Sequence, residues 1–341
     1  MRDLLIAGGG PIGLATALHA VRAGLDVAVL EPRRGTIDKA CGEGLMPGAV
    51  AALHGLGVRP PGQPLTGIRY VADGLAAEAP FKHGPGLGVR RTALHEALSA
   101  AVAAAGVPVE HRAVRSVQSR ADRVVVDGEA ARYLVAADGL HSPVRRLLDL
   151  DRPARGRRRY GQRRHVAMAP WSSYVEVHWS RLGEAYVTPV SPDEVGVAVL
   201  TRERLPWAQL LRSFPALVDR LSDQAATSTV RGAGPLRQRA RHRVAGRVLL
   251  VGDAAGYVDA LTGEGIALGL AQAAAAIAAI SAGEPAGYER AARQLGRRHE
   301  LLTHGLLTAT RSATVRHYLV PAAARMPGVF ATAVDQLARP A

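Results

Sequence analysis

The sequence predicts an α/β protein in which a parallel sheet with flanking helices is interrupted by an antiparallel-sheet lobe and followed by C-terminal helices. Three observations favour this class. Residues 1–31 have the pattern of a strand, a glycine-rich turn, a helix and a second strand. Residues 165–200 have strand-like patterning over successive segments, which is typical of an antiparallel sheet. Residues 247–251 again have the pattern of a buried strand, so the chain returns to the first sheet.

The N-terminal βαβ pattern predicts a dinucleotide site. Residues 4–7 predict a short buried strand, residues 14–23 a helix, and residues 25–30 a second strand followed by Glu31. The turn after the first strand holds three glycines in G-x-G-x-x-G spacing, namely Gly8, Gly10 and Gly13. Such a turn directs backbone N–H groups and a helix N-terminus at a pyrophosphate. Glu31 stands where an acid accepts hydrogen bonds from a ribose diol.

Composition sets broader limits. A chain of 341 residues is too long to fold around one compact hydrophobic core, so we expect two lobes. The net charge of +14 comes almost wholly from arginine, because Lys39 and Lys82 are the only lysines. Aromatic residues are scarce and no nucleic-acid motif occurs, so no nucleic-acid partner is predicted. Cys41 is the only cysteine, which rules out an intramolecular disulfide and fits a reducing compartment.

No stretch predicts a segment that crosses a membrane. The most apolar one, residues 266–280, falls short of the ~18 uninterrupted apolar residues of a spanning helix and predicts a packed helix instead. The N-terminus lacks a charged region followed by a cleavable apolar stretch. We therefore expect a cytoplasmic protein without stable membrane insertion, and none of these features predicts an oligomeric state.

The first half of the chain predicts short elements. They are a helix at 49–56, a hairpin at 65–81 with its turn at Asp73-Gly74, a strand at 87–90, a helix at 92–105, and strands at 107–117, 123–126 and 132–137. Thr92 is the expected N-cap of the longer helix. Its expected buried stripe is Leu94, Leu98 and Val102.

An arginine-rich break at 151–164 precedes the second lobe. It is either a solvated segment or a strand edge that faces an anion, and we expect the solvated segment. The next elements are strands at 173–179, 184–188 and 194–200, a helical pair at 206–221, the returning strand at 247–251, a helix at 265–282, and two further C-terminal helices.

Glycine and acidic motifs follow three of the predicted strands. Besides the first turn, these are Asp138-Gly139-Leu140-His141-Ser142-Pro143-Val144-Arg145 and Gly252-Asp253-Ala254-Ala255-Gly256. Ligands of open α/β sheets bind at the carboxyl ends of strands, so we expect the three motifs to meet at one site. Asp253 is suited to accept hydrogen bonds from a polyol. On physical grounds alone, Asp138 is as readily the N-cap of the following helix as a ligand-binding residue, and Arg145 is as readily a surface charge.

Together these motifs resemble the para-hydroxybenzoate hydroxylase-type FAD oxidoreductases, over residues 1 to about 285. The resemblance implies a Rossmann-type FAD-binding domain of the glutathione reductase and para-hydroxybenzoate hydroxylase kind, interrupted by an antiparallel-sheet substrate domain. It implies FAD as cofactor and NAD(P)H as a transient reductant. The domains then comprise residues 1–65, 85–160 and 236–285 for FAD, 66–84 and 161–235 for the substrate, and 286–341 for the C-terminal helices.

The same resemblance implies which residues bind the cofactor. The first motif holds the ADP pyrophosphate, Glu31 the adenosine ribose and Asp253 the ribityl chain, while Arg91 lies near the phosphates or the ribityl chain. The full expected set is Gly8, Gly10, Pro11, Ile12, Gly13, Glu31, Pro32, Arg33, Cys41, Gly42, Arg91, Val114, Asp138, Gly139, Arg145, Gly252, Asp253, Gly263, Gly265 and Ile266. No metal site is expected.

Two further stretches resemble the geranylgeranyl reductase branch, residues 38–45 and 256–266. The motif of that branch that ends in Phe-Pro corresponds to residues 184–189 here, which keep Pro189 but lack most of the aromatic residues. We therefore expect a flavoprotein monooxygenase that uses NAD(P)H and O₂ to hydroxylate or epoxidise a small aromatic or polyketide-like metabolite through a flavin C4a-hydroperoxide. The alternatives are a geranylgeranyl reductase-like enzyme that reduces C=C bonds of an isoprenoid or other apolar substrate, and a nonredox FAD protein.

Three residues beside the expected flavin are candidates for a catalytic role. Cys41 either packs as a small loop residue or shapes the face of the flavin. Glu43 and Glu264 are the only acids in the two loops expected to flank the ring, and either is a candidate general acid or base. For Glu264 an equal alternative is charge complementation of a helix N-terminus.

Overall fold

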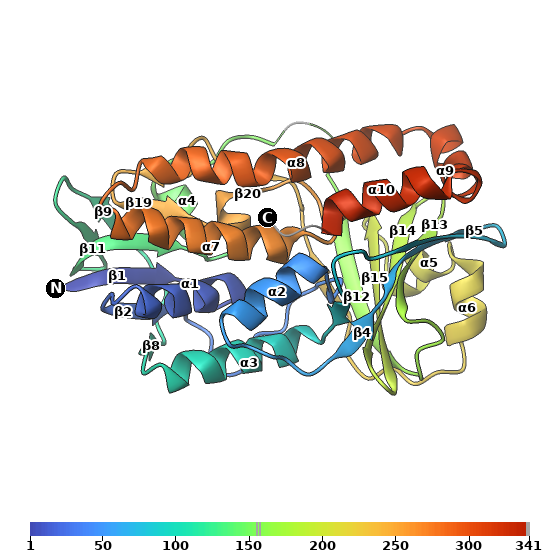
Figure 1. The fold of residues 1–341 in the computed structure, drawn as a ribbon, viewed down its shortest axis with the longest axis horizontal. Helices are drawn as coiled ribbons and strands as arrows, with labels where there is room; N and C mark the ends of the chain where they lie inside the picture. Colours follow the sequence, from blue (N-terminus) through green and yellow to red (C-terminus); the bar gives the residue numbers. More distant parts are fainter. Residues whose placement is uncertain (155, 157, 339–341) are drawn as a thin grey trace.

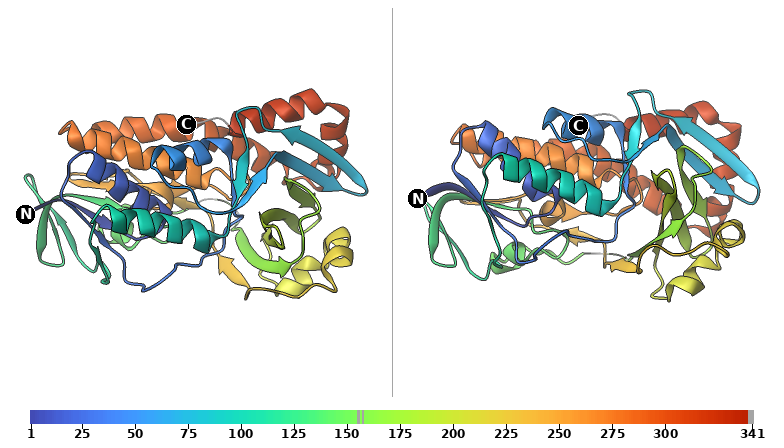
Figure 2. Two further views of the ribbon diagram at one scale, coloured as in Figure 1. Left: turned by 60° about the horizontal axis from the view of Figure 1, so that its bottom comes forward. Right: turned by 90° about the horizontal axis from the view of Figure 1, so that it is seen from below.

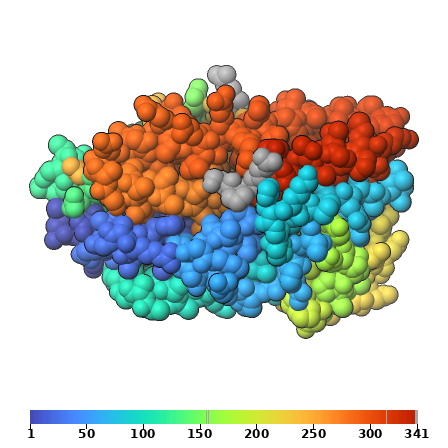
Figure 3. Space-filling model, in the orientation of Figure 1, coloured from blue at the N-terminus to red at the C-terminus, as the bar shows by residue number. Residues whose placement is uncertain are grey.

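The structure is a computed structural model that describes residues 1–338 apart from 155 and 157. It has two lobes side by side, with a band of C-terminal helices along one side of both (Figure 1). The space-filling view shows the same band running from one end of the molecule to the other (Figure 3).

The first lobe is built on the predicted parallel sheet. Its strand order is β18-β19-β11-β1-β2-β8, with β10 paired to β11 and β9 paired to β10. The strands are β1 (Arg2–Ala7), β2 (Val27–Leu30), β8 (Val109–Glu110), β9 (Val117–Ser119), β10 (Val124–Val126), β11 (Glu129–Ala136), β18 (Val244–Ala245) and β19 (Val248–Leu250). β19, β11, β1, β2 and β8 pair in parallel, so their carboxyl ends share one edge. The predicted return of the chain to this sheet is thus confirmed.

Alternation along β1 separates the two faces of this sheet. Leu4 and Ile6 face the core formed with the helices, whereas Leu5 and Ala7 face a second core on the opposite side. The helices of the first face are α1 (Pro11–Arg22), α2 (Pro47–Gly55), α3 (Arg91–Ala104) and α7 (Gly265–Ser281). The opposite core includes residues of β10 and of α4 (Pro143–Leu147).

The second lobe is one seven-stranded sheet of order β16-β12-β15-β14-β13-β5-β6. Its strands are β5 (Gly67–Ala72), β6 (Leu75–Pro80), β12 (Tyr160–Ala167), β13 (Tyr174–Trp179), β14 (Gly183–Ser191), β15 (Glu194–Thr201) and β16 (Arg231–Ala233). All neighbours are antiparallel except β13 and β5. The helical pair follows as α5 (Trp207–Leu211) and α6 (Pro215–Leu221). The predicted hairpin at 65–81, with its Asp73-Gly74 turn, supplies β5 and β6.

Two small sheets lie between these units. One consists of β3 (Gly44–Leu45), β7 (Gly86–Gly88) and β4 (Gln63–Leu65), and the other of β17 (Gln238–Arg239) and β20 (Gly256–Tyr257). A short 3₁₀ turn, η1 (Gly252–Ala255), follows β19.

Three helices follow α7 in the described part of the chain, where two were predicted. They are α8 (Gly287–Ala309), α9 (Ala313–Arg325) and α10 (Pro327–Ala338). The hydroxyl of Ser312 caps α9 by accepting from the Val315 N–H, and Pro327 starts α10 at a position where a missing N–H costs nothing. α9 and α10 pack on the β5–β6 hairpin, as Figure 2 shows from two further directions.

The predicted cap of α3 is wrong. Thr92 lies inside the first turn, and Arg90 occupies the N-cap position without a side-chain bond. The carboxylate of Glu43, from a distant loop, instead accepts a 2.8 Å hydrogen bond from the Arg91 N–H. The predicted strand at 107–117 is also interrupted. β8 ends at Glu110 and β9 begins at Val117, and in the segment between them the N–H groups of Arg115 and Ser116 donate to the Asp127 carboxylate instead of to a neighbouring strand. The stripe of Leu94, Leu98 and Val102 is buried as expected.

Candidate functional site

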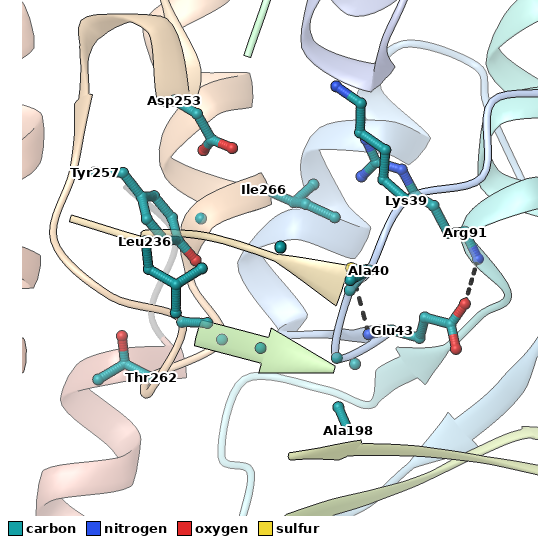
Figure 4. Close-up of a pocket in the computed structure, with 18 of the residues that line it drawn as sticks. Lys39, Ala40, Glu43, Arg91, Ala198, Leu236, Asp253, Tyr257, Thr262 and Ile266 are labelled. Atoms are coloured by element: carbon teal, nitrogen blue, oxygen red, sulfur yellow. Dashed lines mark hydrogen bonds between the residues drawn. The ribbon is translucent and has the colours of Figure 1, made fainter. Parts of the chain in front are cut away.

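A cavity of about 620 Å³ lies where the carboxyl edge of the parallel sheet meets the second lobe. The loops that follow β1, β11 and β19 all contribute to its lining. Loop 39–46 and strands of the second lobe complete it, as the close-up in Figure 4 shows in part. The predicted meeting of three strand-end motifs is therefore present in the structure.

The glycines of the first turn meet three different steric demands. Gly8 has φ +102°, and a Cβ there would lie 2.6 Å from the Ala137 carbonyl oxygen. A Cβ on Gly13 would lie 1.8 Å from the Gly8 carbonyl oxygen, so only glycine lets the helix and the strand lie this close. A Cβ on Gly10 would meet only Arg91 Nη2, at 3.9 Å, and Gly10 lines the cavity. The backbone at Gly10 thus forms an open cradle at a helix N-terminus, which fits a pyrophosphate.

Three cationic side chains surround this cradle: Arg33, Lys39 and Arg91. Burial lowers the pKa of Lys39, and the neighbouring Arg33 and Arg91 lower it further. Crowded cations of this kind fit an anionic ligand. Sequence reasoning missed Lys39, although its rarity was a signal, because the chain has only two lysines among 43 basic residues. Figure 4 shows Lys39 and Arg91 on one side of the cavity and Asp253 on the other.

Asp138 and Asp253, which follow strands β11 and β19, have carboxylate oxygens that accept no hydrogen bond from the described residues. Asp253 lines the cavity, and no residue in the described ranges donates a hydrogen bond to its carboxylate. Burial raises the pKa of Asp253. Asp138 Oδ2 accepts from the Val144 N–H at 2.9 Å, whereas Asp138 Oδ1 is buried without a partner among the described residues. One Asp138 oxygen therefore supports the first turn of α4, whose N-cap is Ser142, and the other has unused hydrogen-bonding capacity that fits a ligand.

Arg145 lies behind the cavity lining. Its buried guanidinium donates to the carbonyl oxygens of Leu140 and Ala254 and forms an ion pair with Asp151. It also donates to the Asp253 carbonyl at 3.3 Å. Arg145 thus ties together the loops after β11 and β19, and it positions Asp253 without lining the cavity itself.

The structure divides the predicted cofactor residues into two groups. Those that line the cavity are Gly8, Gly10, Pro11, Ile12, Arg33, Cys41, Gly42, Arg91, Asp138, Gly139, Asp253, Gly263, Gly265 and Ile266. Those outside the lining are Gly13, Glu31, Pro32, Val114, Arg145 and Gly252. Glu31 Oε2 accepts from the Gly9 N–H at 2.8 Å, and Arg33 forms an ion pair with the same carboxylate. Val114 packs beneath the sheet in the second core.

The three catalytic candidates have different surroundings. Cys41 lines the cavity, and burial raises the pKa of its thiol, so the thiol stays protonated. Glu43 also lines the cavity and has a left-handed backbone with φ +59°. Glu264 is not among the lining residues, because its carboxylate bonds His299 Nδ1 of α8 at 2.7 Å. Glu264 therefore joins the start of α7 to α8 instead of facing a ligand.

The arginine-rich stretch is not simply the solvated segment that was expected. Arg159 and Arg163 are only 9% and 1% exposed. Arg159 pairs with Glu184 and Asp259, and Arg163 with Asp38. Strand β12 alternates its side chains, so residues 161, 163 and 165 point inward and Arg163 finds a carboxylate there. Positions 155 and 157 of this stretch lie outside the described residues.

The far wall of the cavity is apolar. Strands β5 and β13 contribute Ile68, Tyr70, Val175 and Val177, and helices α8 and α10 contribute Leu306, Val334 and Leu337. The lining thus changes from charged near the parallel sheet to apolar under the second sheet and the C-terminal helices. Such a gradient suits a charged cofactor at one end and an apolar molecule at the other.

Comparison with known proteins agrees with this geometry. The sequence model described as "FAD binding domain" matches residues 1–286. The chain belongs to this FAD-dependent oxidoreductase family. It is 30% identical to the menaquinone reductase of Mycobacterium tuberculosis, over 79% of this chain and 74% of that one. It is 25% identical to digeranylgeranylglycerophospholipid reductase 1 of Methanothermobacter thermautotrophicus, over 79% and 74%.

Solved structures show the same fold. The p-nitrophenol 4-monooxygenase PnpA of Pseudomonas putida superposes with a TM-score of 0.82 at 18% identity, over 99% of this chain and 98% of that one. The flavin-dependent brominase Bmp2 gives a TM-score of 0.82 at 16% identity, over 99% and 93%. The fold is that of an FAD-binding flavoprotein, and the open cradle at Gly10, the free Asp138 oxygen and the Asp253 carboxylate fit FAD. Within the described residues, no helix is long and apolar enough to cross a membrane.

Proposed function

We propose that the protein is an FAD-dependent oxidoreductase that reduces a C=C bond of an apolar, isoprenoid-like molecule, with a nicotinamide nucleotide as reductant. The observation that carries this proposal is the apolar far wall of the cavity, built from Ile68, Val175, Val177, Leu306 and Val334. An isoprenoid chain has no polar groups, so it suits a wall that offers few hydrogen-bonding partners. The two relatives named as reductases support the same class.

Residues of the first lobe would hold the cofactor, which supplies hydride transfer when bound. Gly10 leaves room for the pyrophosphate, Arg33 and Lys39 offset its charge, and Asp253 accepts from the hydroxyls of the ribityl chain. Gly263 and Gly265, at the N-terminus of α7, present the positive end of a helix to the cavity. The apolar wall keeps water from the substrate.

A second candidate is monooxygenation of a small aromatic or polyketide-like metabolite, with O₂ as co-substrate. Polar lining residues favour it, because His141, Gln162 and Arg163 also contribute to the cavity and offer partners for a phenol or carbonyl group. A relative named 3-amino-4-hydroxybenzoate 2-monooxygenase, from Streptomyces cremeus, supports this reaction at 33% identity over 175 residues.

A two-stage flavin experiment separates the candidates. The purified FAD-loaded protein is reduced by NADPH or NADH without oxygen and then mixed with a polyprenyl quinone or a geranylgeranyl compound. The reductase oxidises its flavin in this mixture, and after any quinol has been reoxidised to quinone, mass spectrometry finds two hydrogen atoms added to the isoprenoid chain. The monooxygenase instead needs oxygenated buffer, shows an oxygen-dependent transient absorbance and transfers label from isotopic O₂ into a phenolic product. Reduced protein that gives neither product contradicts both proposals.

A further inference from the structure

We propose that Glu43, His165 and Ser228 form a proton path that leads from the outside of the second lobe to the wall of the cavity. The three side chains form a continuous hydrogen-bonded chain that runs from Ser228 through His165 to the cavity-lining carboxylate of Glu43. The inference rests on the proposed function only in that a two-electron reaction in the cavity takes up a proton. It holds for a reductase and for a monooxygenase alike.

Hydrogen bonds and close packing hold Glu43, at the inner end of the path, in one position. Glu43 Oε2 lies 2.6 Å from His165 Nε2, while Glu43 Oε1 accepts the Arg91 N–H at 2.8 Å. A Cβ on Gly196 would lie 2.8 Å from Glu43 Oε2, so glycine at that position makes room for the carboxylate. These contacts hold a buried carboxylate at the cavity wall in one position, as a group that relays a proton requires.

The two ring nitrogens of His165, in the middle of the path, have defined donor and acceptor roles. Arg163 Nη1 lies 3.1 Å from His165 Nδ1, and a guanidinium only donates, so Nδ1 accepts. The ring therefore carries its proton on Nε2 and donates it to Glu43. His165 is fully buried, and the other charged groups facing this cluster are Arg163, 4.0 Å from Glu43 Oε1, and Asp38, which pairs with Arg163.

The outer end lies at the edge of the sheet. Ser228 Oγ accepts from the backbone N–H of His165 at 2.9 Å and lies 2.8 Å from His165 Nδ1. The Ser228 hydroxyl, at 2.8 Å, is nearer to Nδ1 than Arg163 Nη1 is, and the two donors share the single lone pair of that nitrogen in a three-centre hydrogen bond. Ser228 is partly exposed, so its hydroxyl can exchange protons with water. Every hydrogen bond of the chain thus points from the surface to the cavity.

Transfer along this chain conserves protons. Ser228 gives its hydroxyl proton to Nδ1, His165 gives the Nε2 proton to Glu43, and Glu43 gives a proton to the group in the cavity. Water returns a proton to Ser228, and rotation of the hydroxyl and the imidazole restores the first arrangement. Glu43 is the donor at the cavity, whereas His165 and Ser228 act through it.

The test measures proton delivery apart from electron delivery. The FAD-loaded protein is mixed without oxygen with reduced methyl viologen in weak buffer that contains a pH indicator. Two viologen radicals each lose one electron, and the bound FAD gains two electrons and one proton from the solvent. We expect viologen bleaching at the wild-type rate in H165Q but proton uptake about 100-fold slower. S228A shows the same delay, and S228T restores the wild-type rate.

The chain offers a matched control. His299 pairs with Glu264 at 2.7 Å and is also buried, but neither residue lines the cavity, so H299Q takes up protons at the wild-type rate. Nitrogen NMR of the histidines in the protein without FAD gives an independent readout. We expect one neutral Nε2–H signal that disappears in H165Q and shifts in S228A.

Wild-type proton uptake in both H165Q and S228A overturns the path, as does an Nδ1–H tautomer of His165. Both measurements use no substrate. A result that overturns the proton path is therefore distinct from a result that overturns the proposed reaction. The latter would be a wild-type protein with normal proton uptake that forms no product.

Discussion

Gly13 packs directly against the carbonyl of Gly8, and a methyl group on Gly13 would lie 1.8 Å from that oxygen. We expect G13A to separate α1 from β1 and to destabilise the protein by about 3 kcal/mol, the upper end of overpacking costs. Because the turn moves with the helix, FAD binding is lost as well. Thermal unfolding and flavin fluorescence measure both effects. G55A is the control, since Gly55 also lies in a helix but has open space around it. Equal stability of G13A and G55A would contradict this account.

Gly10 differs from Gly13 in having free space toward the cavity. We expect G10A to keep the wild-type melting temperature without cofactor and to weaken FAD binding by about 10- to 100-fold. The physical reason is that the methyl group occupies the space of the pyrophosphate and blocks its approach to the backbone N–H groups. Titration of the cofactor-free protein with FAD measures the affinity. An unchanged affinity would mean that the pyrophosphate lies elsewhere.

Lys39 lines the cavity together with Arg33 and Arg91, so three positive charges converge there. We expect K39Q to lower FAD affinity by roughly 10- to 100-fold, since a hydrogen bond to a charged group contributes about 1.5–3 kcal/mol. The difference from wild type should shrink as salt screens the charge. K82Q is the control, because Lys82 is exposed and does not line the cavity, so this variant should bind FAD normally. Similar affinities for K39Q and K82Q would rule out this role.

Glu184 makes folding stability depend on pH. Burial raises the pKa of its carboxyl from 4.5 to about 7, although the neighbouring Arg159 favours the charged form. Between these values the folded protein keeps a proton that the unfolded chain has lost, so stability falls as the pH rises. Relative to E184Q, the wild type should lose up to about 1.4 kcal/mol per pH unit in this window. Denaturant unfolding from pH 4.5 to 7 measures the difference.

Glu289 on α8 is the control for Glu184. Burial alone would raise its pKa, but hydrogen bonds from the Arg243 backbone N–H and the Arg293 side chain outweigh that effect and lower it. Its stabilising contribution is therefore present above pH 4.5 and is lost as the pH falls below it. E289Q should differ from wild type by a constant amount between pH 4.5 and 7. If E184Q behaved in the same way, the carboxyl of Glu184 would be ionised throughout this range.

Local patterns in the sequence suffice to predict the βαβ unit, the interrupted parallel sheet and the convergence of Gly8, Asp138 and Asp253. Each follows from local periodicity or from the rule that parallel strands present their carboxyl ends at one edge. The roles of residues whose partners are distant in the chain emerge only from the folded structure. Glu43 caps α3 and meets His165 across 122 positions, and Glu264 turns to His299.

The arginine-rich stretch shows the physical reason. Composition predicts a solvated segment, because an isolated guanidinium is costly to bury. Arg159 and Arg163 are nevertheless buried, since Glu184, Asp259 and Asp38 arrive from other elements to compensate their charge. A periodic pattern records which face of an element is buried, but it does not record which distant charge will meet it there. That information arises only when the two lobes fold against each other.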